Sequence, residues 1–439
     1  MLTRICFGLA LLVAMPLWAQ VEPSATGPPP SSADAMQTPP PVSGEIYPAA
    51  TGSETRSNEL RGGLTFETAY DDNVLAGGGA APVADFSYSI RPNISFDQST
   101  ARLHNTFTYS PGFTLYQHTS TRNEADQSAA ASFQYRLSPH AALSLRDSFQ
   151  KSTNVFNQPY GGVSGSTQAP IEGVVAPFAE QIGNTANAEI SYQFSRNGMV
   201  GGGGTSSIIN YPNPAQAAGI SNSNSRGGSA FYNLRLSSTQ YVGINYQYSF
   251  SAASGTTGES DTRMSTIYSF YTLYLKHALS LSVSGGPQHF DVAQPSLPES
   301  AAWTPAVTAS MGWQKSQSTF AASYSRTVSG AGGLLGAFQA NNTNGSVRWQ
   351  FIRAWTVGGT VTYATEKNAV TAFEATSPGG HTIAATVSLQ HPIGEHLMAE
   401  AGYSRLNQSY TGIAAVSENP DSDREYISIS YQFARPLGR

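Results

Sequence analysis

The chain has 439 residues, which allows two or three domains or one large β-barrel. Its formal charge is −5 and only 12% of its residues are charged, so the composition offers no basic surface for nucleic acid. The single cysteine is Cys6, so once a leader containing it is removed we expect neither disulfides nor cysteine chemistry.

Residues 1–19 have the pattern of a secretory signal peptide. Arg4 precedes an apolar run from Ile5 to Val13, and the segment ends in the small residue Ala19. The run is shorter than the roughly 20 residues that a helix needs to cross a bilayer. Cleavage after Ala19 removes Arg4 and takes the formal charge from −5 to about −6.

Residues 20–58 are rich in Pro, Ser, Ala and Gly, and include two Pro-Pro-Pro runs at 28–30 and 39–41. Such a composition cannot bury a core, so we predict a disordered periplasmic spacer. A segment that binds a periplasmic partner is the alternative. The remaining residues, 59–439, form the predicted barrel domain.

Alternating polarity with a period of two predicts about eighteen β-strands in this domain. The expected strands are 60–71, 83–98, 101–117, 127–138, 140–151, 183–195, 199–211, 226–237, 240–251, 262–275, 278–289, 301–314, 317–329, 340–352, 354–366, 380–391, 395–408 and 423–433. Sixteen strands remain an alternative, because the seventh segment is rich in glycine and the second and third contain proline.

The connections alternate between short turns and longer polar loops. The longer loops are expected at 72–82, 118–126, 152–182, 212–225, 252–261, 290–300, 330–339, 367–379 and 409–422. This alternation is typical of outer-membrane barrels, in which the short turns face the periplasm. The sequence therefore predicts an all-β fold, a transmembrane antiparallel β-barrel in the bacterial outer membrane, surrounded by outer-membrane lipid and with both termini in the periplasm. A soluble β-sandwich or propeller would not require alternating loop lengths.

An aromatic-Gln-aromatic triplet recurs just before several short turns. It reads Phe133-Gln134-Tyr135, Tyr192-Gln193-Phe194, Trp349-Gln350-Phe351 and Tyr431-Gln432-Phe433. All four lie on descending strands in the predicted topology, so we expect their rings at the periplasmic interface. Tyr246-Gln247-Tyr248 lies on an ascending strand, nearer the opposite interface.

Polar residues between the apolar strand positions are expected to line the pore. The candidates are Arg91, Arg102, Arg136, Arg146, Arg235 and Arg348, set against Glu67, Asp85, Asp97, Glu189, Glu400 and Glu425. They could form an arginine ladder that selects anions, or paired charges on a hydrated wall. We prefer the paired charges.

The loop 152–182 is the longest and is the candidate constriction, with Phe156, Tyr160 and Phe178 as its bulky residues. Entry into the lumen and a position over the mouth are equally compatible with its sequence.

No pattern of residues indicates catalysis, a cofactor or a metal. Asp71-Asp72-Asn73 lacks the spacing of a calcium loop, and the glycines 201–204 lack the context of a phosphate-binding loop. The histidines show no metal-binding spacing, and no serine lies in a Gly-x-Ser-x-Gly motif. We therefore do not expect an enzyme, although a hydrolase site assembled across strands would leave little linear signature.

The segment from Leu64 to Leu75 contains Tyr70-Asp71-Asp72-Asn73 at the end of the first strand. It resembles the opening hairpin of the putative β-barrel porin 2 family, and the strand rhythm extends this likeness loosely over 60–433. The resemblance implies an outer-membrane channel that passes a polysaccharide or oligosaccharide, with periplasmic components of exopolysaccharide export as partners. A general diffusion porin and a non-transporting surface or scaffold barrel are the alternatives.

Overall fold

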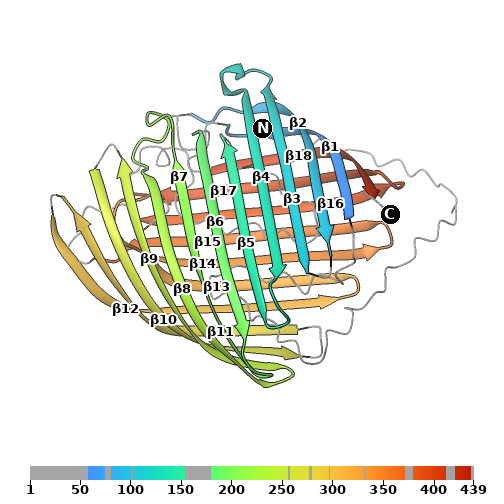
Figure 1. Cartoon of the computed structure of the whole chain (residues 1–439). Helices are drawn as coiled ribbons and strands as arrows, with labels where there is room; N and C mark the ends of the chain where they lie inside the picture. Colours follow the sequence, from blue (N-terminus) through green and yellow to red (C-terminus); the bar gives the residue numbers. More distant parts are fainter. Residues whose placement is uncertain are drawn as a thin grey trace.

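The chain forms a closed antiparallel β-barrel of 18 strands (Figure 1). The computed structural model describes residues 58–74, 81–100, 102–153, 156, 179–255, 258–275, 279–295, 297–330, 333–370, 379–411 and 421–436. The predicted signal peptide and all but the last residue of the predicted spacer lie outside these ranges. Within the described ranges, no helix has the length and apolar character needed to cross a bilayer.

Each strand pairs with its neighbours in chain order, and the eighteenth strand pairs with the first. The strands are β1 (Asn58–Asp71), β2 (Asp85–Ser99), β3 (Leu103–Tyr116), β4 (Glu124–Arg136), β5 (Ala141–Ser152), β6 (Gln181–Gln193), β7 (Gly198–Asn210), β8 (Asn222–Ser237), β9 (Gln240–Gly255), β10 (Gly258–Leu275), β11 (Leu279–Gln294), β12 (Leu297–Lys315), β13 (Ser318–Ser329), β14 (Phe338–Ile352), β15 (Trp355–Asn368), β16 (Gly380–Ile393), β17 (Leu397–Tyr410) and β18 (Asp421–Pro436). One short 3-10 helix, η1 (Ser120–Arg122), lies between β3 and β4.

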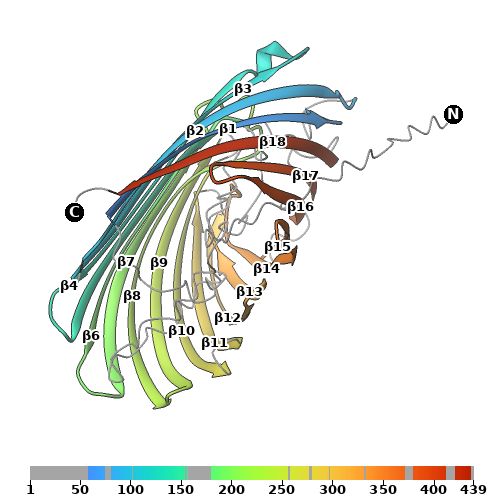
Figure 2. The same cartoon turned by 90° about the vertical axis from the view of Figure 1, so that its right-hand side faces the viewer.

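The barrel closes where β18 lies beside β1 (Figure 2). Their register runs from Glu59 opposite Pro436 to Asp71 opposite Arg424, so the start of the barrel and its end lie at the same rim. We call this rim, where the short turns also lie, the turn end, and the opposite rim the loop end. The predicted count of eighteen is confirmed, and the alternative of sixteen is wrong.

The alternating pattern places apolar side chains on the outer wall. On β18, Ile427 and Ile429 are 60% and 49% exposed, whereas Ser428 and Ser430 between them are buried toward the lumen. Large apolar side chains are exposed in this way on every strand of the barrel except β4. An outer wall of this kind is suited to a lipid environment, because apolar residues are needed only at every second position.

The recurring aromatic triplets lie on the outer wall near the turn end, on β4, β6, β14 and β18 as expected. The structure adds a role for the central glutamine, which points inward. Gln350 Nε2 donates to the carbonyl of Arg353 at 2.7 Å, and Gln193 Nε2 donates to that of Arg196 at 3.4 Å. In both triplets the glutamine therefore binds the turn that follows it, while the aromatic rings face outward.

The second, third and seventh predicted segments, which contain proline or many glycines, form the strands β2, β3 and β7. Glycines on three strands lie directly opposite an aromatic residue whose ring covers them: Gly201 faces Phe231, Gly243 faces Phe270, and Gly402 faces Tyr426. A Cβ at any of these glycines would lie within 2.5 Å of the ring, so only glycine leaves the necessary space. These three rings lie flat against the inner wall.

Two of the predicted loops are wrong. Residues 252–261 and 290–300 lie mostly in strands, because β9 continues to Gly255, β10 starts at Gly258, β11 ends at Gln294 and β12 starts at Leu297. The strands β9–β12 have 16 to 19 residues, longer than the others of the barrel apart from β8 and β18. Small and polar residues are frequent in these stretches, so their composition resembles that of a loop, although their backbone continues the strand pairing above the apolar belt.

The strand β13 leaves its neighbour β12 near the loop end. Pairing between them covers only Val307–Lys315 of β12, and ends where Val307 faces Arg326. Beyond that point the main chain of Val328 pairs instead with the side chain of Gln288 on β11, at 2.7 and 3.0 Å. The end of β13 therefore bends into the lumen and leads the following loop inward.

Candidate functional site: the narrowed lumen

The inner wall carries polar side chains from all strands, and most of the predicted pore-lining residues belong to it. Of the six candidate arginines together with Glu189 and Glu400, seven residues lie in strands at inward positions: Arg91, Arg136, Arg146, Glu189, Arg235, Arg348 and Glu400. Arg102 is the exception, because it lies in the turn between β2 and β3, where its carbonyl accepts from the Arg136 amide. That the Arg102 side chain lines the pore therefore stays a prediction.

The candidate residues do not gather at one height. Arg136 and Arg235 lie close to the turn end, and Arg146 lies near Glu189 on the adjacent strand. Glu400 accepts hydrogen bonds from Tyr426 at 2.9 Å and Gln390 at 3.3 Å. The described wall thus contains no ring formed by these arginines, which agrees with charges held in local pairs.

Glu425, which the sequence placed in the lumen, points outward. It lies opposite Tyr70 on β1 and Tyr403 on β17, in the same outward series as Ile427 and Ile429. Its neighbour Arg424 takes the inward position instead.

A cluster of charged side chains occupies the inner wall near the loop end of β18, β1, β2 and β4. We call it the charged cluster; its members are Glu67, Asp71, Arg91, Glu124, Asp126 and Arg424. Arg424 Nη2 lies 2.8 Å from Glu67 Oε1, and Arg91 Nη1 lies 3.1 Å from Glu67 Oε2. Arg424 Nε lies 3.7 Å from Asp71 Oδ1. The register of three adjacent strands brings these residues together, because Asp71 faces Arg424 and Thr65 faces both Arg91 and Ser430.

The β4 side of the charged cluster is built around a glycine on β3. Gly112 lies between Arg91 and Asp126, and a Cβ there would be 3.4 Å from Arg91 and 3.6 Å from Asp126. Both charged side chains therefore pass over Gly112 in ordinary contact. Glu124 interacts electrostatically with Asp126, Arg424 and Arg91, so four carboxylates surround two guanidinium groups.

The start of the loop after β5 turns toward the charged cluster. The amide of Thr153 donates to Asp126 Oδ1 at 3.2 Å, and the ring of Phe156 lies 6.0 Å from the guanidinium carbon of Arg424. Phe156 is 6% exposed, and Arg424 is 1% exposed. A phenyl ring at this distance from a guanidinium group interacts favourably with its charge. The Phe156 ring thus covers the guanidinium group of Arg424.

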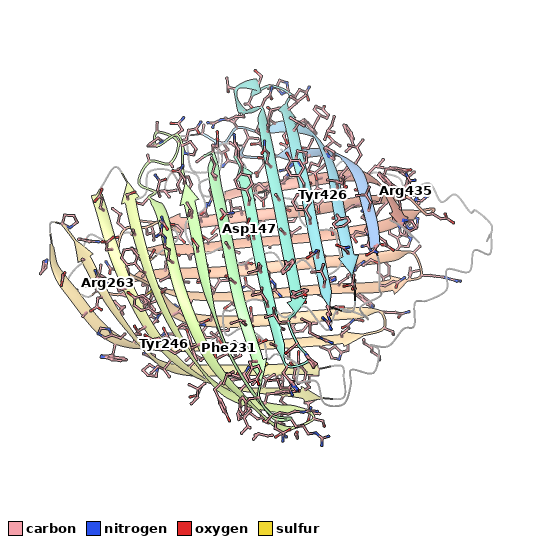
Figure 3. The ribbon with its side chains drawn as sticks, in the orientation of Figure 1. Asp147, Phe231, Tyr246, Arg263, Tyr426 and Arg435 are labelled. Carbon is pink, nitrogen blue, oxygen red and sulfur yellow. The ribbon has the colours of Figure 1, made fainter. Side chains whose placement is uncertain are left out.

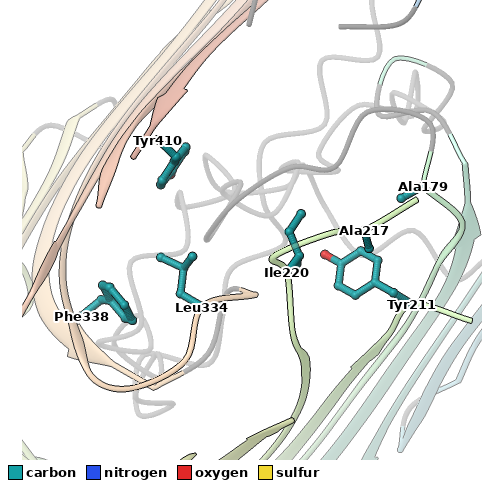
Figure 4. Close-up of a cluster of buried hydrophobic side chains, with 7 residues drawn as sticks. All are labelled: Ala179, Tyr211, Ala217, Ile220, Leu334, Phe338 and Tyr410. Atoms are coloured by element: carbon teal, nitrogen blue, oxygen red, sulfur yellow. The ribbon is translucent and has the colours of Figure 1, made fainter. Parts of the chain in front are cut away.

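An apolar cluster, which we call the loop bridge, joins segments from separate parts of the wall (Figure 4). The segment 211–221, between β7 and β8, contributes three residues, and Leu334 comes from the segment 330–337 between β13 and β14. Its members are Ala179, Tyr211, Ala217, Ile220, Leu334, Phe338 and Tyr410. Because Phe338 and Tyr410 belong to β14 and β17, the loop bridge connects two sides of the barrel.

Hydrogen bonds hold the segment 330–337 against the segment 211–221 and against the strands β9 and β10. The Ser221 amide donates to the Gly333 carbonyl at 2.8 Å, and Ser251 Oγ donates to the Gly330 carbonyl at 2.9 Å. The Gly336 amide donates to Ser260 Oγ at 2.9 Å. Gly333 and Gly336 have φ values of 83° and 107°, which glycine adopts without the penalty that a Cβ would bring.

A second apolar cluster lies behind this segment, against the inner face of β10 and β11. It contains Met264, Phe290, Val292, Val328, Ala337 and Val370. Apolar side chains are exposed to water in an open lumen, so the inward fold of 330–337 removes this surface from solvent.

The loop 152–182 enters the lumen at both of its described ends. Phe156 covers Arg424 in the charged cluster, and Ala179 belongs to the loop bridge. Tyr160 and Phe178 lie outside the described residues. The sequence left open whether this loop enters the lumen. It predicted loops at 212–225 and 330–339, but not that the segments 211–221 and 330–337 fold inward. The signal was present in the apolar run Leu334-Leu335 within a supposed polar loop.

The Asp71-Asp72-Asn73 element has a structural role at the seam. Asp71 pairs with Arg424, Asp72 Oδ1 accepts from the Asp423 amide at 2.8 Å, and Asn73 Nδ2 donates to the Asp421 carbonyl at 2.7 Å. These contacts join the exit of β1 to the entry of β18. In the described part of the chain, no group of three or more His, Cys, Asp or Glu residues is arranged to hold a metal ion.

No protein-family model and no curated protein matches this chain. Among solved structures, it is similar to OccK2 (OpdF) of Pseudomonas aeruginosa, with 10% identity and a TM-score of 0.42 over 86% of this chain and 98% of OccK2. OpdK of the same organism, solved with vanillate, gives 11% identity and a TM-score of 0.39 over 86% of this chain and 99% of OpdK. The FrpB iron transporter of Neisseria meningitidis gives 12% identity and a TM-score of 0.38, and the chain spans about 62% of its length. Identities this low give no information about the solute.

Proposed function

We propose that this chain is an outer-membrane β-barrel channel for small hydrophilic solutes. The observation that carries the proposal is the combination of an apolar outer wall with a polar inner wall that is narrowed by inward-folded segments. The outer wall suits lipid, and a closed barrel of 18 strands is wide enough to enclose water unless something fills it. The charged cluster lies on the inner wall, and the loop bridge joins segments that fold inward from it.

The charges at the narrow region favour cations. Four carboxylates and two guanidinium groups give the charged cluster a formal excess of negative charge. A charged ring or cluster at a constriction selects ions of the opposite sign. We therefore infer that the channel passes cations, or solutes bearing amino groups, more readily than anions.

Polysaccharide export is the finer function that the family resemblance implies. It is supported by the hydroxyl and amide groups along the inner wall, which can exchange hydrogen bonds with sugars. The loop bridge works against it, because a polymer is wider than a small solute and must pass the inward-folded segments that the apolar contacts hold together. A general diffusion channel is therefore the better proposal for the barrel in this conformation.

Conductance across a planar bilayer tests the proposal. We expect the purified chain to conduct with a preference for potassium over chloride, and the variant Asp126→Asn to reduce that preference measured by the reversal potential. Gln390→Ala, which changes a neutral inward residue on β16, is the matched control. Absence of conductance, also in a variant lacking residues 157–178, would refute the channel. Block by an acidic oligosaccharide, with anion preference, would favour polysaccharide export.

A further inference from the structure

Two exposed arginines flank a phenylalanine on the outer wall near the loop end. Arg226 on β8 and Arg263 on β10 both lie opposite Phe250 on the intervening strand β9. Two strand spacings separate the arginine backbones, a distance of about 10 Å. Arg226 is on the same face of β8 as the exposed Tyr232, and Arg263 is on the same face of β10 as the exposed Ile267. Both guanidinium groups therefore extend outward, and we call Arg226, Phe250 and Arg263 the arginine row.

The arginine row lies at the edge of the apolar belt. On β9, the outward residues Ile244, Tyr246 and Tyr248 precede it on the side of the turn end, and all three are exposed. Between the turn end and the arginine row, no outward position of β8, β9 or β10 carries a charged residue. Figure 3 shows Tyr246 and Arg263 on the same flank of the barrel, with Arg263 nearer the loop end. Because tyrosine is frequent where a bilayer meets water, the arginine row lies at the level of the lipid headgroups.

The charge of the arginine row is not compensated by the wall. Among the described residues, no carboxylate lies within salt-bridge distance of either arginine. Two aspartates are near by register: Asp291 is opposite Arg263 on β11, and Asp261 precedes it by two residues. Asp291 instead lies 3.6 Å from Nδ1 of His289. Both aspartates lie on the sides of Arg263 that face away from Arg226, so positive charge flanks the space between the two guanidinium groups.

The chemistry of the arginine row is suited to a phosphate group. A guanidinium group presents parallel N–H donors that bind two phosphate oxygens at once. Two guanidinium groups on either side of one apolar side chain can approach the same phosphate from opposite sides, and a phosphate monoester carries nearly two negative charges to match them. A zwitterionic headgroup is a poorer match, because its own cation is repelled by both arginines.

We propose that the arginine row binds the phosphate of a lipid headgroup in the leaflet at the loop end. Arg226 and Arg263 hold the phosphate from two sides, and the acyl chains lie along the exposed Ile244 and Tyr246 on the side of the turn end. A free phosphate ion lacks these chains and gains only the charge interaction, which dissolved salt weakens. The proposal rests on the membrane placement that the proposed function requires.

Lipid binding by the full-length chain in a zwitterionic detergent tests the proposal. Phosphatidate, whose headgroup is a phosphate monoester, is titrated, and the bound lipid is counted by native mass spectrometry. The double variant Arg226→Ala/Arg263→Ala should bind the first phosphatidate at least about tenfold more weakly, because charge-assisted hydrogen bonds to the phosphate are lost. Arg405→Ala is the matched control: this exposed arginine on β17 already has two carboxylates 3.6 Å away, so its loss should leave the affinity unchanged.

The lipid site would be overturned by unchanged phosphatidate binding in the double variant, by an equal loss in the control, or by equal affinity for phosphatidylcholine. Displacement of the lipid by inorganic phosphate at an equal concentration would assign the arginine row to a free phosphate ion and overturn it as well. Conductance separates this proposal from the proposed function. The double variant should conduct like the parent chain, because the arginine row points away from the lumen. A parent chain that binds phosphatidate without conducting would refute the channel and leave the lipid site supported.

Discussion

The charged cluster and the loop bridge both narrow the lumen near the loop end, but they are built from different parts of the chain. The charged cluster belongs mainly to strands, and the registers of β18, β1, β2 and β4 fix its positions. The loop bridge takes four of its seven residues from the segments 211–221 and 330–337. The positions of the charged cluster are thus fixed by strand pairing, whereas those of the loop bridge depend on how the connecting segments pack against the wall.

Because the charged cluster is held by ion pairs and the loop bridge by apolar contacts, the two regions should respond differently to mutation. Ion pairs that are buried on adjacent strands depend on one another, since removal of one partner leaves charge without compensation. The loop bridge is held by apolar contacts and a few backbone hydrogen bonds, so it can loosen without opening the barrel. Mutations in the two regions should therefore separate barrel stability from conductance.

The largest effect is expected for Arg424→Ala. This variant leaves Glu67 and Asp71 buried near the seam with their main partner removed, which should lower the free energy of unfolding by about 3–5 kcal/mol. Urea unfolding in vesicles, followed by tryptophan fluorescence, would measure the change. Arg405→Ala is the control: its two carboxylate partners lie 3.6 Å away on the exposed outer wall, and the change should stay within about 1 kcal/mol. Equal effects would contradict a special role for the charged cluster.

A smaller loss of stability, with a gain in conductance, is expected for Leu334→Ala. Leu334 is 1% exposed in the loop bridge, and truncation of a buried leucine costs about 2–5 kcal/mol, with the low end expected where a loop can relax. Single-channel recordings should show a larger conductance than the parent chain, because contact between the two segments weakens. Val307→Ala, on the outer wall, is the control. A conductance that stays the same would mean that the loop bridge does not limit the path.

The smallest effect is expected for Gln350→Ala at the turn end, far from both regions. The side chain of Gln350 binds the carbonyl of Arg353, and its removal should cost about 0.5–1.5 kcal/mol without a change of conductance. Gln432→Ala serves as the control, since this glutamine has the equivalent position in the triplet of β18, and β18 continues as a strand to Pro436. Equal losses in the two variants would show that the turn contact contributes nothing.

The alternation of polarity predicted most of the strands correctly, because a period of two decides which side of a wall each residue occupies. The same period also predicts which residues of β18 face the lumen. Ile427 and Ile429 face outward, and the same period places Glu425 outward and Arg424 inward. The prediction that Glu425 lines the lumen conflicts with this period. For the same reason, the sequence analysis did not identify Arg424, which pairs with both Glu67 and Asp71 in the charged cluster.

Loop boundaries were less predictable, for a physical reason. Above the apolar belt a strand has no lipid to face, so polar residues are tolerated at the outward positions of β9–β12 while the backbone pairing continues. The stretches 252–261 and 290–300 therefore have the composition of loops and the structure of strands. The composition of a stretch indicates whether its side chains face lipid or water. It does not indicate whether its backbone pairs with a neighbouring strand.

The sequence by itself determined the barrel, its strand order and the face on which each alternating residue lies, because these follow from local periodicity and from the lengths of the turns. Only the tertiary structure decided which charges meet and which segments fold inward. Arg424 reaches Glu67 across a seam between the last strand and the first, and Leu334 reaches Ile220 across the lumen. Contacts between residues so far apart in the chain depend on barrel closure and register, which no local pattern encodes.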